Sequence, residues 1–199
     1  MNVGAAVKEV KASAYTVPTE QPESDGTLRW DSTTLVLAEV EAGGQIGLGY
    51  TYGHVSAAQL IHDMLADQVL GCNAFDIPAA WQAMVDAVRN AGRPGIASTA
   101  ISAADIALWD LKAKLLGLPL ASLLGACRKS VPVYGSGGFT SCDTGQLTAQ
   151  LQNWAQSGIA RVKMKVGRDP AADTERVAAA RASVGKDIAL FVDANGAYT

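Results

Sequence analysis

The feature that most constrains the fold is a regular alternation of short apolar runs and helical segments after residue 130. The runs are VPVYGSG (131–137), RVKMKVG (161–167) and IALFVDAN (188–195), and apolar residues recur at helical spacing in 143–157 and 170–184. This order of strand, helix, strand, helix and strand, with connections of this length, predicts right-handed crossovers between parallel strands. Such strands are mostly apolar because helices cover the sheet.

The residues before this alternation have a different organisation. TTLVLAEVEA (33–42) predicts a strand, followed by a turn at GGQ and a second hairpin strand at 46–52. PTEQPESDGT (18–27) is rich in turn formers and predicts a loop. Three helices are then expected, one capped by Ser56, one that begins at Asp76 with Pro78 in its first turn, and one over 98–117 that ends at Gly117. The chain is therefore predicted to be an α+β domain (1–128) followed by an α/β domain (129–199).

Four polar residues stand at matching ends of two predicted strands. Lys163 and Lys165 are two residues apart, as are Asp193 and Asn195, so each pair shares one face of its strand. Ligands of parallel α/β folds bind at the C-terminal ends of the strands. The two pairs are therefore expected to converge on one cleft.

The chemistry of these residues suits a base beside a metal. Lysine is a poor base near neutral pH because its reference pKa is about 10.4, but a second ammonium group and desolvation lower that pKa. Asp193 offers the hard oxygen ligand that magnesium prefers, and further ligands have to come from other residues. From spacing alone, the two lysines also fit a solvent-facing edge strand and Asp-Ala-Asn-Gly also fits an ordinary turn.

Composition and charge exclude several other classes of function. The formal net charge is −3 and the isoelectric point is about 5.3, unlike the basic footprint of a nucleic-acid-binding protein. No apolar run approaches the roughly 20 residues of a membrane helix, and the N-terminus lacks a signal-peptide core, so a soluble cytoplasmic protein is expected. The three cysteines are expected to be ordinary reduced thiols, and His54 and His62 ordinary helix or loop residues.

At this point the chain resembles the enolase superfamily, in its mandelate racemase and muconate lactonizing enzyme branch. The segments that carry the resemblance are TTLVLAEVEAGGQIGLGYTY, AISAADIALWDLKAKLLGLPLASLLG, VKMKVG and LFVDANGAY. Their order and spacing extend over essentially the whole of the 199 residues. The resemblance implies a capping domain followed by a modified TIM barrel.

The resemblance also implies roles for individual residues. Lys165 would abstract a proton from the carbon next to a carboxylate, and Lys163 would tune its pKa and contact the substrate carboxylate. Asp193 would be the first of three acidic magnesium ligands, and Asn195 would hold the substrate or a neighbouring lysine. Magnesium would stabilise the enediolate. A specificity loop over Val17 to Asp31 is also implied, with Tyr50 and Tyr52 nearby and Ser136 in contact with the substrate.

The chain is short for this fold. A TIM barrel takes about 250 residues, whereas residues 131 to 199 supply only three strands and two crossover helices. We therefore expect a barrel truncated after its third strand, an incomplete magnesium site and little activity of this chain alone. The expected partners are a small carboxylate substrate and either the remainder of the same enzyme or further copies in a homo-oligomer.

Three functional interpretations follow. The first is a magnesium-dependent lyase or isomerase, most simply a dehydratase or racemase, of a 2-hydroxy acid or acid sugar. The second is a catalytically inert fragment that serves as a structural or interaction unit. The third is a nucleotide-binding module suggested by GSGGF (135–139), although Thr140 stands where the third glycine of a dinucleotide fingerprint is required.

Overall fold

The protein is described by a computed structural model over residues 4–198, and it forms two compact units. The N-terminal unit comprises the chain up to Val17 and Thr33–Cys127. The C-terminal unit comprises Pro18–Ser32 and the chain from Arg128 onward. The first two strands thus contribute their stem to one unit and their tip, residues 18–32, to the other.

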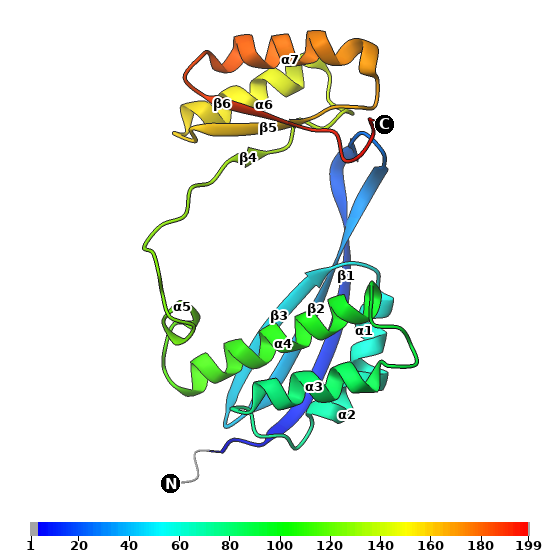
Figure 1. Ribbon diagram of the computed structural model, residues 1–199, viewed down its shortest axis with the longest axis vertical. Helices are drawn as coiled ribbons and strands as arrows, with labels where there is room; N and C mark the ends of the chain where they lie inside the picture. The colour runs from blue at the N-terminus through cyan, green and yellow to red at the C-terminus, as the bar shows by residue number, and fades with distance from the viewer. Residues whose placement is uncertain (1–3, 199) are drawn as a thin grey trace. The chain divides into compact units, whose positions relative to one another are not determined.

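The N-terminal unit contains a three-stranded sheet in the order β1-β2-β3 (Figure 1). β1 is Val7–Ser24, β2 is Arg29–Ala42 and β3 is Gln45–Tyr52, and β2 and β3 pair antiparallel. Alternate residues of β2, including Val36, Ala38 and Val40, are fully buried. This period of two confirms the predicted hairpin, with one face of the sheet turned to the core.

Helices pack on that apolar face of the sheet, with one exception. Their bounds are α1 Ser56–Leu60, the π-helical turn η1 Ile61–Leu65, α2 Ala66–Val69, α3 Ile77–Ala87, α4 Ile96–Leu115 and the short α5 Leu120–Leu123. The exception is the short α5, which contacts α4. Small residues of α4, such as Ala103 and Ala107, are buried and allow α4 to approach the sheet closely. Across residues 4–198, every helix is too short or too polar to cross a membrane.

The C-terminal unit confirms the order of the predicted elements, although its first strand is shorter than the predicted 131–137. Its elements are β4 Gly135–Ser136, α6 Thr144–Gln156, β5 Arg161–Lys165, α7 Pro170–Val184 and β6 Ala189–Asp193. The sheet is parallel in the order β4-β5-β6. Val162 and Met164 of β5 are fully buried in a core shared with α6 and α7, so the intervening lysines of β5 face the opposite side.

Two local predictions were wrong. Residues 18–24 continue β1 instead of forming a loop, because β1 is an edge strand and Pro18 and Pro22 are tolerated there. Ser56 does not cap a helix, since Val55 before it already has helical backbone angles. The Ser56 hydroxyl instead lies 2.9 Å from Nδ1 of His54.

Candidate active site

The predicted convergence of lysines and acid occurs at the C-terminal ends of β5 and β6. The parallel register places Lys165 beside Asp193. Nζ of Lys163 and Nζ of Lys165 both donate to Oδ2 of Asp193, at 2.9 and 2.7 Å. All three side chains are largely shielded from solvent, with 12–29% of each exposed. The two lysines therefore do not lie on a solvent-facing edge strand, since β5 lies between β4 and β6 in the sheet.

Asn195 completes this group. Its backbone has a positive φ of 50°, in the left-handed region that asparagine tolerates better than most residues. Oδ1 of Asn195 accepts from Nζ of Lys165 at 2.8 Å, and its backbone N–H donates to Oδ1 of Asp193 at 3.1 Å. The last residue of β6 and the turn after it thus place a carboxylate oxygen and an amide oxygen within hydrogen-bond distance of Lys165.

The electrostatics of the group follow from these contacts. The two lysine hydrogen bonds, aided by the Asn195 backbone N–H, hold the pKa of Asp193 far below its usual range despite partial burial. The hydrogen bond and charge of Asp193 raise the pKa of Lys163, although burial opposes this. Lys163 is therefore a firmly positive group in this state, suited to hold a carboxylate. The role of Lys165 as the base stays a prediction.

Ser136 and Tyr134 lie on either side of the β4 start, close to Lys163. Ser136 lies opposite Lys163 in the β4–β5 register and is exposed, so its contact with a substrate stays a prediction. Tyr134 was not predicted, yet its ring lies 5.5 Å from Nζ of Lys163 and packs edge-on against Phe191. This aromatic pair shields one side of Lys163. The sequence contains no local pattern from which this contact could have been predicted.

The hairpin tip is anchored to the loops after β4 and β5 by hydrogen bonds to its backbone carbonyls. Thr140 donates its backbone N–H to the carbonyl of Ser24 at 2.8 Å, and an arginine N–H of Arg168 donates to the carbonyl of Leu28 at 2.8 Å. At Gly26, an added Cβ would lie 2.5 Å from the Ala194 carbonyl oxygen and 2.7 Å from that of Val166. Only glycine therefore permits this close approach to the ends of β5 and β6.

Asp25 shapes the tip itself. Its buried carboxylate accepts from the backbone N–H groups of Thr27 and Leu28, both at 2.7 Å, and from the Thr27 hydroxyl at 3.1 Å. Burial opposes ionisation of Asp25, but these bonds and the charge of Lys165 together lower its pKa. The tip is thus a tight hydrogen-bonded turn next to the lysine pair.

We expect Asp25→Ala to lower the free energy of unfolding by about 2 kcal/mol at pH 7, since it leaves buried donors without a charged acceptor. The pKa of Asp25 is lower in the folded chain than the unfolded value of about 3.9. Its contribution is therefore complete above that unfolded value and is lost as the pH falls through the folded pKa. Urea unfolding at pH 7 and pH 3 measures both effects.

Asp25→Asn is the matched control because Oδ1 can accept the same bonds without the charge. It should retain part of the stability at pH 7, and its difference from the wild type should shrink in acid. Equal stability of Asp25→Ala and the wild type at pH 7 would contradict the role given to this turn.

The glycine-rich run GSGGF is explained by packing. A Cβ at Gly135 would lie 2.4 Å from the Trp154 ring, and one at Gly138 would lie 2.7 Å from Cβ of Met164. The Gly138 backbone N–H donates to Oε1 of Gln150 at 2.8 Å. These glycines therefore allow α6 and β5 to pack against the loop, and this N–H group is already used within the chain.

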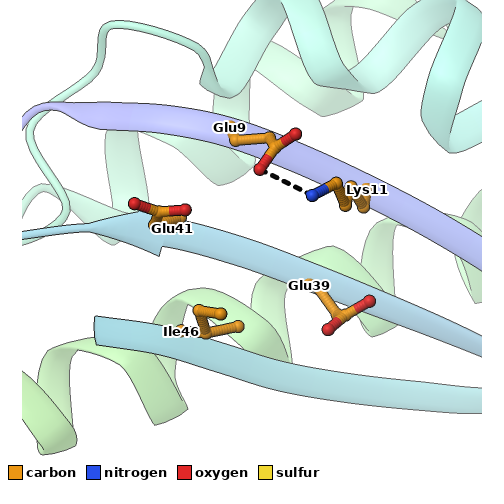
Figure 2. A pocket seen from close by; sticks show the side chains of 5 residues that line it. All are labelled: Glu9, Lys11, Glu39, Glu41 and Ile46. Carbon is orange, nitrogen blue, oxygen red and sulfur yellow. Dashed lines mark hydrogen bonds and ion pairs between the residues drawn. The ribbon is translucent and has the colours of Figure 1, made fainter. Parts of the chain in front are cut away.

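The N-terminal unit holds Tyr50, which was predicted to bind substrate. Its side chain is exposed and packs edge-on against Tyr52, with ring centroids 6.3 Å apart, and its role stays a prediction. Figure 2 shows a small hollow on the same sheet, lined by Glu9, Lys11, Glu39, Glu41 and Ile46, where Lys11 pairs with Glu9 at 2.8 Å. Its volume of about 30 Å³ suits a water molecule better than a sugar acid.

The donor set for a metal is partial. Between residues 4 and 198, no three His, Cys, Asp or Glu side chains gather as a cluster that could hold a metal ion. Asp193 offers a single carboxylate, and two ammonium groups already converge on its Oδ2. This oxygen therefore attracts cations and fits one ligand position of a hard metal such as magnesium.

Both halves of the chain match family models. Residues 9–125 match the mandelate racemase / muconate lactonizing enzyme N-terminal domain, and residues 146–199 match the enolase C-terminal domain-like family. A mandelate racemase/muconate lactonizing enzyme-like protein from Rubrobacter xylanophilus is 58% identical, with a TM-score of 0.96 over 98% of this chain and 54% of that one.

Two curated relatives are a cycloisomerase and a dehydratase. The 3,6-anhydro-alpha-L-galactonate cycloisomerase of Streptomyces coelicolor is 36% identical over 97% of this chain and 55% of its own length. The L-talarate/galactarate dehydratase of Salmonella typhimurium is 38% identical over 96% of this chain and 51% of its own. The chain thus spans about half the length of these relatives.

Solved structures extend the likeness to three dimensions. The Salmonella typhimurium dehydratase, liganded with magnesium and L-lyxarohydroxamate, has a TM-score of 0.90 at 35% identity over 99% of this chain and 54% of that one. The two units therefore correspond to the N-terminal portion of an enolase-superfamily fold. The family models, the relatives and the fold all agree: the chain belongs to the mandelate racemase and muconate lactonizing enzyme family of the enolase superfamily.

Proposed function

We propose that the protein containing this chain abstracts the proton α to a carboxylate of an acid sugar or other 2-hydroxy acid, and that it acts as a dehydratase or an isomerase. The observation that carries the proposal is the convergence of Lys163, Lys165 and Asp193 at the C-terminal ends of β5 and β6. The relatives also support this proposal, since their names describe dehydratases and cycloisomerases of sugar acids.

In the proposed mechanism Lys163 holds the substrate carboxylate by its positive charge. Nζ of Lys165, in its neutral form, takes the α-proton, and the electron pair of the C–H bond moves into the carboxylate to give an enediolate. In a dehydratase, the electron pair then returns to form a carbon–carbon double bond as the β-hydroxyl leaves with a proton. In a racemase, a proton returns to the opposite face of the same carbon.

Magnesium is the cofactor we propose, because related structures are solved with it and Asp193 supplies a suitable oxygen. Asp193 would hold the ion together with acidic ligands beyond this pair of strands. When bound, a magnesium ion supplies Lewis-acid stabilisation of the negative charge on the substrate carboxylate. Asn195 keeps Lys165 oriented through the 2.8 Å contact to Nζ.

The test is deuterium exchange at the α-carbon. The protein containing this chain is incubated in D₂O with magnesium and, in separate samples, galactarate, gluconate and mandelate. The α-proton signal of each substrate is followed by NMR. Loss of that signal for at least one substrate, dependent on magnesium, supports the proposal. Retention of the α-proton in every sample, while a product still forms, would reject proton abstraction as the first step.

A further inference from the structure

The C-terminal unit contains a second cleft, distinct in its lining from the lysine site. It has a volume of about 410 Å³ and is lined by Ser24, Arg29, Thr140, Ser141 and Arg168. Ser24 and Arg29 belong to the hairpin tip, whereas the other three belong to the loops that follow β4 and β5. Two arginines and three hydroxyl groups give this cleft a strongly donor character.

Some of these donors hold the walls of the cleft. The Thr140 hydroxyl donates to the carbonyl of Asp25 at 3.0 Å, so the 2.7 Å contact between Ser24 and Thr140 has the Ser24 hydroxyl as its donor. Arg168 donates one N–H to the carbonyl of Leu28. Ser24 is buried, which fixes this wall in place.

The remaining donors are free to bind a ligand. Among residues 4–198, Arg29 forms no salt bridge and its guanidinium has no hydrogen-bond acceptor, while Arg168 uses a single N–H. Ser141 also lines the cleft and is exposed. No Asp or Glu is among the residues that line the cleft, so its two exposed arginines give it a positive potential that attracts anions.

We propose that this cleft binds an oxyanion, either a carboxylate or a phosphate group, between Arg29 and Arg168. Guanidinium groups match the planar or tetrahedral geometry of such anions through paired charge-assisted hydrogen bonds. The anion would connect the hairpin tip to the loop after β5. Because it binds only the docked tip, it would stabilise the position of that tip at the strand ends.

The experiment is isothermal titration calorimetry of the chain with inorganic phosphate, without magnesium and at constant ionic strength set with chloride. We expect saturable binding with a stoichiometry of one. Arg29→Gln is the decisive variant because Arg29 has no structural bond to lose, and it should weaken binding by about tenfold or more. Arg168→Lys, which retains a donor for Leu28, should weaken it less.

Arg161→Gln is the matched control, since Arg161 is an exposed arginine at the opposite end of β5. It should bind phosphate as the wild type does, and Lys165→Ala should do so as well. Competition with galactarate distinguishes the ligand sources: displacement of phosphate identifies a carboxylate as an accepted anion, and no displacement identifies a phosphate group. Unsaturable heats, or equal weakening by Arg29→Gln and Arg161→Gln, would overturn the proposal.

Discussion

Replacement of Lys165 by alanine should slow the exchange of the substrate α-proton with deuterium by about 10²–10⁴-fold, the contribution of a positioned general base. Lys165 is the lysine that contacts both Asp193 and Asn195, and its side chain is the less exposed of the pair. Alanine removes the only group at this position that can take a proton. The exchange is measured by NMR in D₂O with magnesium and each enantiomer of the substrate, because a second base can act on the opposite face.

Three variants separate catalysis from general damage. Lys165→Arg should not restore exchange, since a guanidinium stays protonated and cannot accept the proton. Lys163→Ala should raise KM more than it lowers kcat, because Lys163 is proposed to hold the carboxylate. Lys8→Ala, at an exposed position of β1, should leave exchange unchanged. Undiminished exchange of both enantiomers by Lys165→Ala would rule out Lys165 as the base.

The second large effect concerns stability. Gly47→Ala and Gly49→Ala should each lower the free energy of unfolding by about 3 kcal/mol, at the upper end of the usual cost of overpacking. A Cβ at Gly47 would lie 2.1 Å from the carbonyl oxygen of Ala107, and one at Gly49 would lie 2.0 Å from that of Ala103. Both obstacles are backbone atoms of α4, so the helix as a whole has to move away from β3.

Gly53→Ala is the matched control for this comparison. Gly53 follows the same strand, and its added Cβ would meet only the Thr99 hydroxyl at an ordinary 3.9 Å. Its effect should lie within about 0.5 kcal/mol. Urea unfolding of the three variants measures the difference, and equal midpoints for Gly49→Ala and Gly53→Ala would show that α4 and β3 do not pack as tightly as described.

Much of the C-terminal unit was predictable because its signals are local. Pro170 and the Asp169 cap begin α7, Gly185 follows its last residue, and Asp143 with Gln146 forms a capping box before α6. The alternation in β5 assigns its two lysines to one face without any knowledge of the rest of the chain. Parallel pairing then brings the ends of β5 and β6 together, and the observed register places Asp193 beside Lys165.

The hairpin tip could not be predicted in the same way. Prolines and turn formers in 18–27 predict a loop, and nothing local indicates that an edge strand would accept them. The close approach of Gly26 to the carbonyls of Ala194 and Val166 joins positions far apart in the chain. The same is true of Arg176, whose side chain donates to the carbonyls of Phe139 and Cys142 and holds the loop after β4.

The sequence by itself therefore determined which residues form the candidate site, because the strand period places Lys163 with Lys165 and Asp193 with Asn195 at the ends of two parallel strands. The tertiary structure decided what surrounds them: the turn of Asp25, the aromatic pair at Tyr134 and the arginine cleft of the hairpin tip. The physical reason is that strand and helix periods are set by backbone geometry between neighbours. Contacts between distant segments instead depend on side-chain shape and burial, which a local pattern does not encode.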